Sequence, residues 1–324
     1  MKNLKIAIIK NNLIFFFYIT PFILCAQDTI YFNSANPFSF KDIILNLENQ
    51  QPQNVYGVLR MPEEFSPQSR YPVIIAVAGS NGWSDHHHEY LSMYRSHGIA
   101  TFELCSFQSR GILSTVGTQV EVTTAMMVLD SYRAYEVLLE NANIKMDKIG
   151  ITGWSLGGGV SLFSAWRPLN DAINKNVNFA VHLPIYPPCI VIPEIFDFGG
   201  EPIHILIGEL DNWTPADACL DFVNQVDASN INITVYPDAH HSFDSNSELM
   251  VKHNGYILED CRFLMKSNGT VCMSFLNIPM TTPFLQKIGL MGCARRGPTY
   301  GRNKNAKRKA FLFAEKFMIK YLND

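Results

Sequence analysis

Residues 148–159 have the sequence KIGITGWSLGGG, in which a short β-branched run leads into a Gly-x-Ser-x-Gly motif and then into small residues. The pattern predicts a strand, a sharp turn that carries Ser155, and the start of a helix. Gly153 and Gly157 stand where side chains would clash with neighbouring backbone, and Trp154 lies between them. A serine at a helix N-terminus faces N–H groups that favour developing negative charge. Ser155 is therefore a candidate nucleophile, although a glycine-rich turn with an incidental serine has the same pentapeptide.

The composition is that of an ordinary globular protein. Of 324 residues, 47% are hydrophobic and 17% are charged, so the chain can bury one substantial core. The formal net charge of -3 gives no reason to expect a nucleic-acid partner. Because no repeat or linker divides the sequence, we expect a single domain over residues 27–324.

The N-terminal residues 1–26 are typical of a secretory signal peptide. Three lysines precede an apolar stretch at residues 13–24, which is followed by Cys25 and Ala26. The apolar stretch is too short for a comfortable membrane span, so no stable span is expected in the mature chain. We expect cleavage after Ala26 and export to a periplasm or to the outside. Lipidation at Cys25 is disfavoured, because a leucine rather than a small residue precedes it.

Export permits disulfide bonds among the six cysteines that remain. Cys189 and Cys219 follow neighbouring predicted strands and are candidates for one disulfide, the alternative being two buried thiols. Two of Cys261, Cys272 and Cys293 are candidates for another, and the sequence does not select the pair. No cysteine spacing matches a zinc site, so no metal is expected.

Buried strands alternate with helices along the chain. Antiparallel lead-in strands are expected within residues 28–60, and further strands at 73–78, 99–104, 177–183, 203–207 and 231–236. One helix is expected over residues 125–139, and a last helix carries Ala310, Phe313, Ala314, Phe317 and Tyr321 on one face. This alternation predicts an α/β fold with a mostly parallel, doubly wound sheet, whose site lies beyond the carboxyl ends of the strands.

A serine nucleophile needs a base and a group that orients the base. In α/β-hydrolases the acid and then the histidine follow the serine, each after a later strand. Here Asp211 follows the strand expected at 203–207, and His240 and His241 follow the strand expected at 231–236. Their order and placement favour catalysis over the turn and loop roles that each would have alone.

Other candidates remain for the acid and for the group that stabilises the oxyanion. Glu209 and Asp217 are alternatives to Asp211, although Glu209 is expected at the site rim and Asp217 at the start of a helix. A glycine turn, AGSNGW at residues 78–83, follows the early buried strand. We expect the backbone N–H groups of Ser80 and Leu156 to stabilise the oxyanion.

The chain resembles the dienelactone hydrolase-like branch of the α/β-hydrolase superfamily. The matching pieces are residues 72–79, 109–111, 153–158, 186–189, 208–219 and 236–243. The resemblance implies Ser155 as nucleophile, Asp211 as orienting acid and His241 as base, because the histidine of this pattern stands two residues before a phenylalanine.

Two departures from the family pattern concern the substrate. Family members that open dienelactones use a cysteine nucleophile, where this chain has Ser155. The residue before Gly79, often histidine in the superfamily, is Ala78. Both put a lactone substrate in doubt and leave acyl transfer intact.

Two further segments bear on the site. The connection between residues 187 and 202 is too short for a large cap after the sixth strand, so the irregular segment 245–308 is the candidate that shapes the pocket. His86, His87 and His88, followed by Glu89, are interpreted as a solvated loop or helix start rather than a metal cluster, because adjacent residues rarely face one ion.

The sequence thus favours an exported serine hydrolase that cleaves a carboxylic ester or related acyl bond of a small molecule, without a cofactor. The alternatives are a catalytically silent α/β-hydrolase-fold binding protein, or a peptidase or acyltransferase with the same triad. The sequence does not select an acyl-chain length or an oligomeric state.

Overall fold

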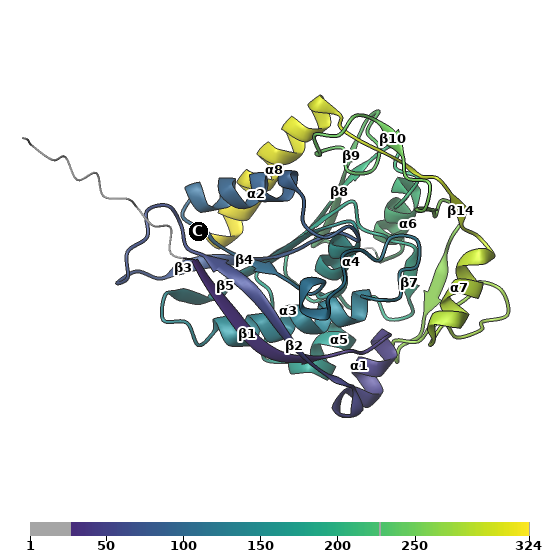
Figure 1. Ribbon diagram of the computed structural model, residues 1–324, viewed down its shortest axis with the longest axis horizontal. Coiled ribbons are helices and arrows are strands. Elements are labelled where there is room, and N and C mark those ends of the chain that lie inside the picture. Colours follow the sequence, from purple (N-terminus) through teal and green to yellow (C-terminus); the bar gives the residue numbers. More distant parts are fainter. Residues whose placement is uncertain (1–26, 227, 324) are drawn as a thin grey trace, which may run out of the picture.

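The computed structural model describes residues 27–226 and 228–323, so the expected signal peptide at residues 1–26 lies outside the described residues. Its centre is an eight-stranded sheet in the order β1-β2-β4-β3-β5-β6-β8-β9 (Figure 1). The six strands from β4 to β9 in this order pair in parallel. β1 and β2 form an antiparallel pair, and β2 joins β4 in antiparallel register. The expected mostly parallel sheet is confirmed.

The bounds of the elements follow chain order. The strands of the large sheet are β1 (Gln27–Ala35), β2 (Pro52–Arg60), β3 (Tyr71–Val77), β4 (Ala100–Leu104), β5 (Ile144–Trp154), β6 (His182–Ile185), β8 (Ile203–Gly208) and β9 (Ile231–Tyr236). The α-helices are α1 (Phe40–Asn46), α2 (Asp85–Ser96), α3 (Thr124–Leu138), α4 (Leu156–Phe163), α5 (Arg167–Asn174), α6 (Ala216–Val226), α7 (Pro283–Met291) and α8 (Lys304–Leu322).

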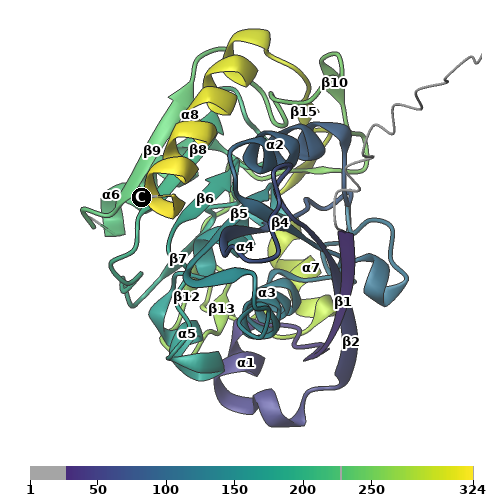
Figure 2. The ribbon, with the colours of Figure 1, turned by 90° about the vertical axis from the view of Figure 1, so that its left-hand side faces the viewer.

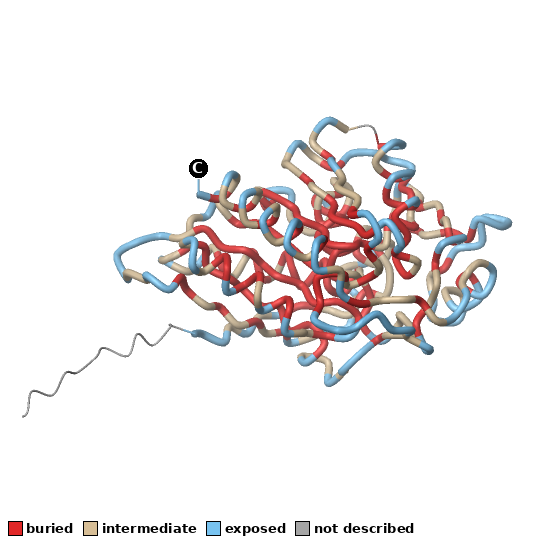
Figure 3. Tube along the Cα trace, turned by 90° about the horizontal axis from the view of Figure 1, so that it is seen from above, coloured by how far each residue is buried: buried red, intermediate tan, exposed pale blue. Residues whose placement is uncertain are grey.

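Helices cover both faces of the sheet. α2 and α8 pack against each other on one face, and α3 and α4 pack together on the other (Figure 2). The central strands are buried on both faces, as continuous apolar runs such as that of β3 require (Figure 3). The last helix buries Ala306, Ala310, Ala314, Met318 and Leu322, while the aromatic side chains of its predicted face are half-buried beside them.

Two expectations about the early elements differ from the structure. The strand expected at 177–183 begins only at His182, because Phe179 turns its ring onto Tyr132 and Tyr135 of α3. Residues 28–60 include the helix α1, whose first turn closes through a reciprocal pair of hydrogen bonds between Ser39 and Asp42.

The segment 245–308 was expected to be irregular, and this prediction is wrong in part. It contains α7 and six short strands, and its last five residues already belong to α8. The strands are β10 (Met250–Val251), β11 (Tyr256–Ile257), β12 (Phe263–Met265), β13 (Val271–Cys272), β14 (Arg295–Arg296) and β15 (Thr299–Tyr300). β12 and β13 pair with each other, and the other short strands pair with partners far along the chain, as β12 also does with β7 (Val191–Pro193), so local periodicity does not reveal them.

Two disulfides tie down the chain around the site. Cys189 is bonded to Cys219 and Cys261 to Cys293, while the thiols of Cys105 and Cys272 are free and buried. The second disulfide joins the two ends of the stretch that carries β12, β13 and α7. It therefore closes a loop in a segment with few long regular elements of its own.

We expect loss of the Cys261–Cys293 disulfide to destabilise the fold. A Cys261→Ser/Cys293→Ser double variant should lower the free energy of unfolding by about 2–4 kcal/mol, because the closed loop restricts the unfolded chain. Urea denaturation followed by intrinsic fluorescence measures the change. Cys272→Ser, which removes a thiol from the same segment without opening a loop, is the control. Equal effects of the two variants would contradict the prediction.

Candidate active site

Ser155 lies in a strained turn at the junction of β5 and α4. Its backbone φ is 56°, a left-handed value that non-glycine residues rarely adopt. The turn is tight because α4 approaches the sheet closely: a Cβ on Gly157 would lie 2.1 Å from the carbonyl oxygen of Val77, and a Cβ on Gly153 would lie 2.1 Å from that of Gly157. The Ser155 N–H donates to the carbonyl of Ile185 over 2.9 Å, which holds the turn against β6.

The structure brings Ser155, His241 and Asp211 into one hydrogen-bonded line. His241 Nε2 lies 3.0 Å from Ser155 Oγ, and His241 Nδ1 lies 2.7 Å from Asp211 Oδ2. With the proton on Nδ1 donated to the carboxylate, Nε2 is free to accept the serine proton. The imidazole and the carboxylate are both buried. The three side chains follow β5, β9 and β8, so parallel neighbours deliver them to one edge of the sheet.

The carboxylate of Asp211 is fixed by three further donors. Oδ1 accepts from the backbone N–H groups of Trp213 and Thr214 over 3.0 and 2.8 Å. The Thr214 hydroxyl lies 3.0 Å from Asp211 Oδ2, from His241 Nδ1 and from the carbonyl oxygen of Tyr186. Sequence reasoning missed Thr214. The Asp-x-x-Thr spacing, which is typical of an aspartate that closes a turn onto its own backbone, is the signal that could have found it.

The ring of His241 is held between two aromatic side chains. Its centroid lies 4.9 Å from the ring of Trp213 and 4.7 Å from that of Tyr186. The carbonyl of His241 accepts from Gly301 N–H over 2.9 Å. The neighbouring His240 instead places Nδ1 2.8 Å from the Thr299 hydroxyl, so it makes its contact with β15 and not with the serine.

The alternative acids lie away from the histidine. Asp217 is exposed at the second residue of α6. Glu209 is also exposed and accepts from the backbone N–H of Asp238 over 3.0 Å.

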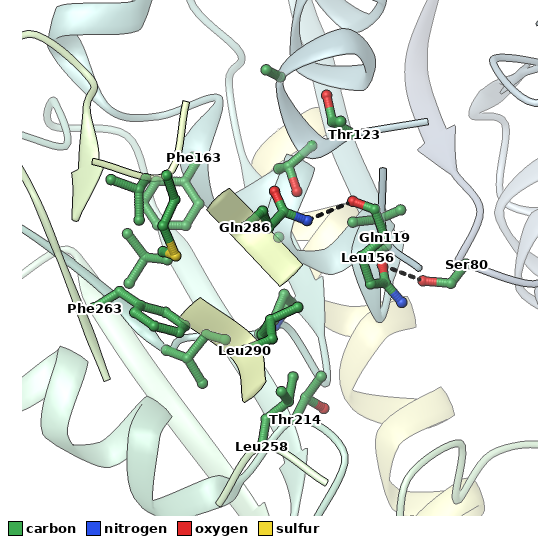
Figure 4. Close-up of a pocket in the computed structure, with 18 of the residues that line it drawn as sticks. Ser80, Gln119, Thr123, Leu156, Phe163, Thr214, Leu258, Phe263, Gln286 and Leu290 are labelled. Atoms are coloured by element: carbon green, nitrogen blue, oxygen red, sulfur yellow. Dashed lines mark hydrogen bonds between the residues drawn. The ribbon is translucent and has the colours of Figure 1, made fainter. Parts of the chain in front are cut away.

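The glycine turn after β3 lies next to the serine. A Cβ on Gly79 would lie 3.3 Å from the Cβ of Ser155. The carbonyl of Ser80 accepts from Thr115 N–H over 2.9 Å, and its hydroxyl lies 3.3 Å from Gln119 Oε1 (Figure 4). Leu156 is the first residue of α4, where an N–H has no acceptor within the helix. That these two amides stabilise an oxyanion stays a prediction.

The helix start expected at His86 and His87 is confirmed, but the alternative that they are solvated is wrong. α2 begins at Asp85, and both imidazoles are buried because its first turn covers the serine turn. His87 stacks on Trp154 with ring centroids 4.4 Å apart, and burial holds its pKa well below the usual value. Burial also lowers the pKa of His86, against an opposing effect of the Asp244 carboxylate.

The described residues show neither a metal cluster nor a membrane-spanning helix. No three His, Cys, Asp or Glu side chains within this part of the chain gather as a metal site would require. Within the same residues, no helix combines the length and the apolar character needed to cross a bilayer.

Two pockets meet at Ser155. An apolar pocket of ≈ 200 Å³ is walled by Phe163 and Leu156 of α4, Phe263 of β12, Leu290 of α7 and Leu258 (Figure 4). A more polar pocket of ≈ 390 Å³ shares Ser80, Ser155 and Trp213 with it and is otherwise lined by different residues. Its lining includes Asp85, His86, His241, Ser245 and Tyr300.

The architecture and site geometry define an α/β hydrolase, and the comparisons with known proteins identify the family. The sequence pattern of the dienelactone hydrolase family matches residues 66–256, more than half of the chain. This chain therefore belongs to the dienelactone hydrolase family. No curated protein sequence matches it.

Two solved structures share the fold at low sequence identity, and a third is similar over part of the chain. The structure named m3DLH is 12% identical, with a TM-score of 0.56, covering 92% of this chain and 99% of its own. The dienelactone hydrolase-like promiscuous phosphotriesterase P91 from metagenomic libraries is 12% identical, with a TM-score of 0.52 and coverages of 91% and 99%. Est1E from Butyrivibrio proteoclasticus is 16% identical, with a TM-score of 0.45 and coverages of 60% and 88%.

We expect Gly157→Ala to destabilise the protein. The added methyl group meets the carbonyl oxygen of Val77, which is backbone and cannot move aside without shifting β3. Overpacking of this kind costs about 1–3 kcal/mol in the free energy of unfolding. Urea denaturation measures it, with Gly200→Ala as the matched control, because no atom lies within 4 Å of a Cβ there. A Gly157→Ala protein as stable as the control would contradict the close approach of α4 to the sheet.

Proposed function

We propose that this protein is an exported serine hydrolase that cleaves a carboxylic ester or related acyl bond through an acyl-enzyme. The observation that carries the proposal is the hydrogen-bonded line from Asp211 through His241 to Ser155. Family membership supports small ester-type substrates in general. The proposal requires neither a cofactor nor a metal.

Each member of the line has a distinct part in the proposed reaction. Ser155 Oγ attacks the carbonyl carbon while His241 Nε2 accepts its proton. Asp211 holds the imidazole and stabilises the positive charge that forms on it. The N–H groups of Ser80 and Leu156 donate to the oxyanion, where removal of one such donor typically costs about 3 kcal/mol. His241 then gives the proton to the leaving group, and water hydrolyses the acyl-enzyme by the reverse sequence.

The second proposal concerns export and domain organisation. The signal-like residues 1–26 and the two disulfides support passage into an oxidising compartment. We propose that residues 27–324 form one domain in which the segment 245–308 shapes the pocket. The support is that Leu258, Phe263 and Leu290 of this segment line the apolar cavity.

Serine-directed chemistry tests the mechanism. Ser155→Ala should abolish both hydrolysis of a short-chain p-nitrophenyl ester and labelling by a fluorophosphonate, because the only attacking oxygen of the mechanism is gone. Initial rates and gel fluorescence measure the two effects. Ser92→Ala, an exposed serine on α2, is the matched control and should retain full activity. Unchanged turnover in the Ser155→Ala variant would rule the mechanism out.

A further inference from the structure

The two pockets at Ser155 differ in chemistry. None of the side chains that line the apolar pocket carries a charge, and its walls are mainly aromatic and aliphatic. Polar side chains such as Thr123 and Gln286 also line it, and Gln286 Nε2 donates to the carbonyl of Gln119 over 2.8 Å (Figure 4). A dry cavity of about 150 Å³ is large enough for benzene. At ≈ 200 Å³, the apolar pocket therefore suits one aromatic ring or a short branched chain.

The polar pocket offers hydrogen-bonding groups instead. Ser245, which is 6% exposed, lines it, and its buried hydroxyl has no hydrogen-bond partner among the described residues. His86 lines it as well, and its Nε2 lies 3.3 Å from the Tyr186 hydroxyl. That hydroxyl donates to the fully buried carboxylate of Asp244 over 2.9 Å. The unpaired hydroxyl of Ser245 favours a ligand that carries hydroxyl groups.

The charges around the polar pocket disfavour an anionic occupant, because Lys307, the cation nearest its lining, is paired with Glu89. Asp85 lies in its lining and the Asp244 carboxylate lies behind it. The imidazole of His86 carries little compensating charge, because burial lowers its pKa. A neutral hydroxylated group is therefore preferred to an anionic one.

The position of His241 sets the direction in which a substrate lies. His241 lines the polar pocket and not the apolar one, whereas Leu156 lines the apolar pocket and not the polar one. The oxygen that leaves must lie within reach of His241 Nε2 to receive its proton. The leaving alcohol therefore belongs in the polar pocket, and the acyl group lies across the serine in the apolar pocket.

We propose that the substrate is an ester of a compact apolar acid, with one aromatic ring or a short branched chain, and a neutral hydroxylated alcohol. The inference rests on the proposed function and specifies its substrate. In the reaction the bond from Ser155 Oγ to the carbonyl carbon forms and the bond from that carbon to the alcohol oxygen breaks. His241 accepts the proton of Ser155 and donates it to the oxygen of the leaving alcohol. Water then releases the acid and restores the serine hydroxyl, so ester and water give acid and alcohol.

A pair of isomeric esters tests the direction. The ethylene glycol monoester of phenylacetic acid carries its ring on the acyl side, and phenethyl glycolate carries it on the alcohol side. The kcat/KM of each ester is divided by its own rate constant for alkaline hydrolysis, which corrects for intrinsic reactivity. The corrected value should be about tenfold or more higher for the first ester. Preference for phenethyl glycolate, or none, overturns the inference while the hydrolase mechanism stands. Hydrolysis of neither ester, together with no fluorophosphonate labelling of Ser155, overturns the proposed function as well.

Filling the apolar pocket tests the acyl assignment. Val271 lines this pocket from β13, and Val251→Phe on β10 is a matched control outside both pockets. Val271→Phe should lower kcat/KM for the phenylacetate ester about tenfold and leave ethylene glycol monoacetate within about twofold. Retained turnover of the acetate shows that the variant is folded. Leu290→Phe is a second test, because it fills the same cavity from α7 and should have the same selective effect. If both folded variants keep the wild-type ratio of kcat/KM between the phenylacetate ester and the acetate, the acyl group lies elsewhere and the proposal fails.

Discussion

The close approach of α4 to the carboxyl ends of β3 and β5 is the constraint on which the site depends. The carbonyl oxygen of Val77 occupies the space that a side chain at Gly157 would need. This contact forces the chain to turn within one residue, and Ser155 takes a left-handed backbone conformation as a result. It also places the first N–H groups of α4 beside the turn after β3. The serine and its proposed oxyanion donors therefore share a single structural cause.

The loops after β6, β8 and β9 are tied to one another, which positions the remaining side chains. Leu210 N–H donates to the carbonyl of Ala239 over 2.8 Å, so the loop that carries the acid contacts the loop that carries the histidine. Thr214 reaches the carbonyl of Tyr186 after β6 as well as the carboxylate of Asp211. Because these bonds link three neighbouring strands, a shift of one loop is resisted by the other two.

The apolar pocket is assembled largely from parts that lie far from the serine in the chain. β12 pairs with β7, and the disulfide between Cys261 and Cys293 closes the loop that contains β12, β13 and α7. Through these links an otherwise weakly structured segment gains a fixed position against α4. The proposed chemistry thus depends on the sheet, and the proposed choice of acyl group depends on the late segment.

Much of the fold and the order of the site residues could be read from the sequence, because both are local signals. The apolar run of β3 reports a strand buried on both faces, and the glycines around Ser155 report a close backbone contact. Asp211 and His241 each follow a strand, and parallel strands end at the same edge of a sheet. These features needed no knowledge of which distant segments meet.

Only the tertiary structure decided the features that depend on distant contacts. The burial of His86 and His87 arises from the packing of α2 on Trp154, which their own polar sequence does not indicate. The pairing of Cys261 with Cys293, which are 32 residues apart, and the shape of the pocket arise when segments separated along the chain come together. The hydrophobic pattern of one helix or strand shows which of its faces is buried. Which other element packs against that face is decided only when the whole chain folds.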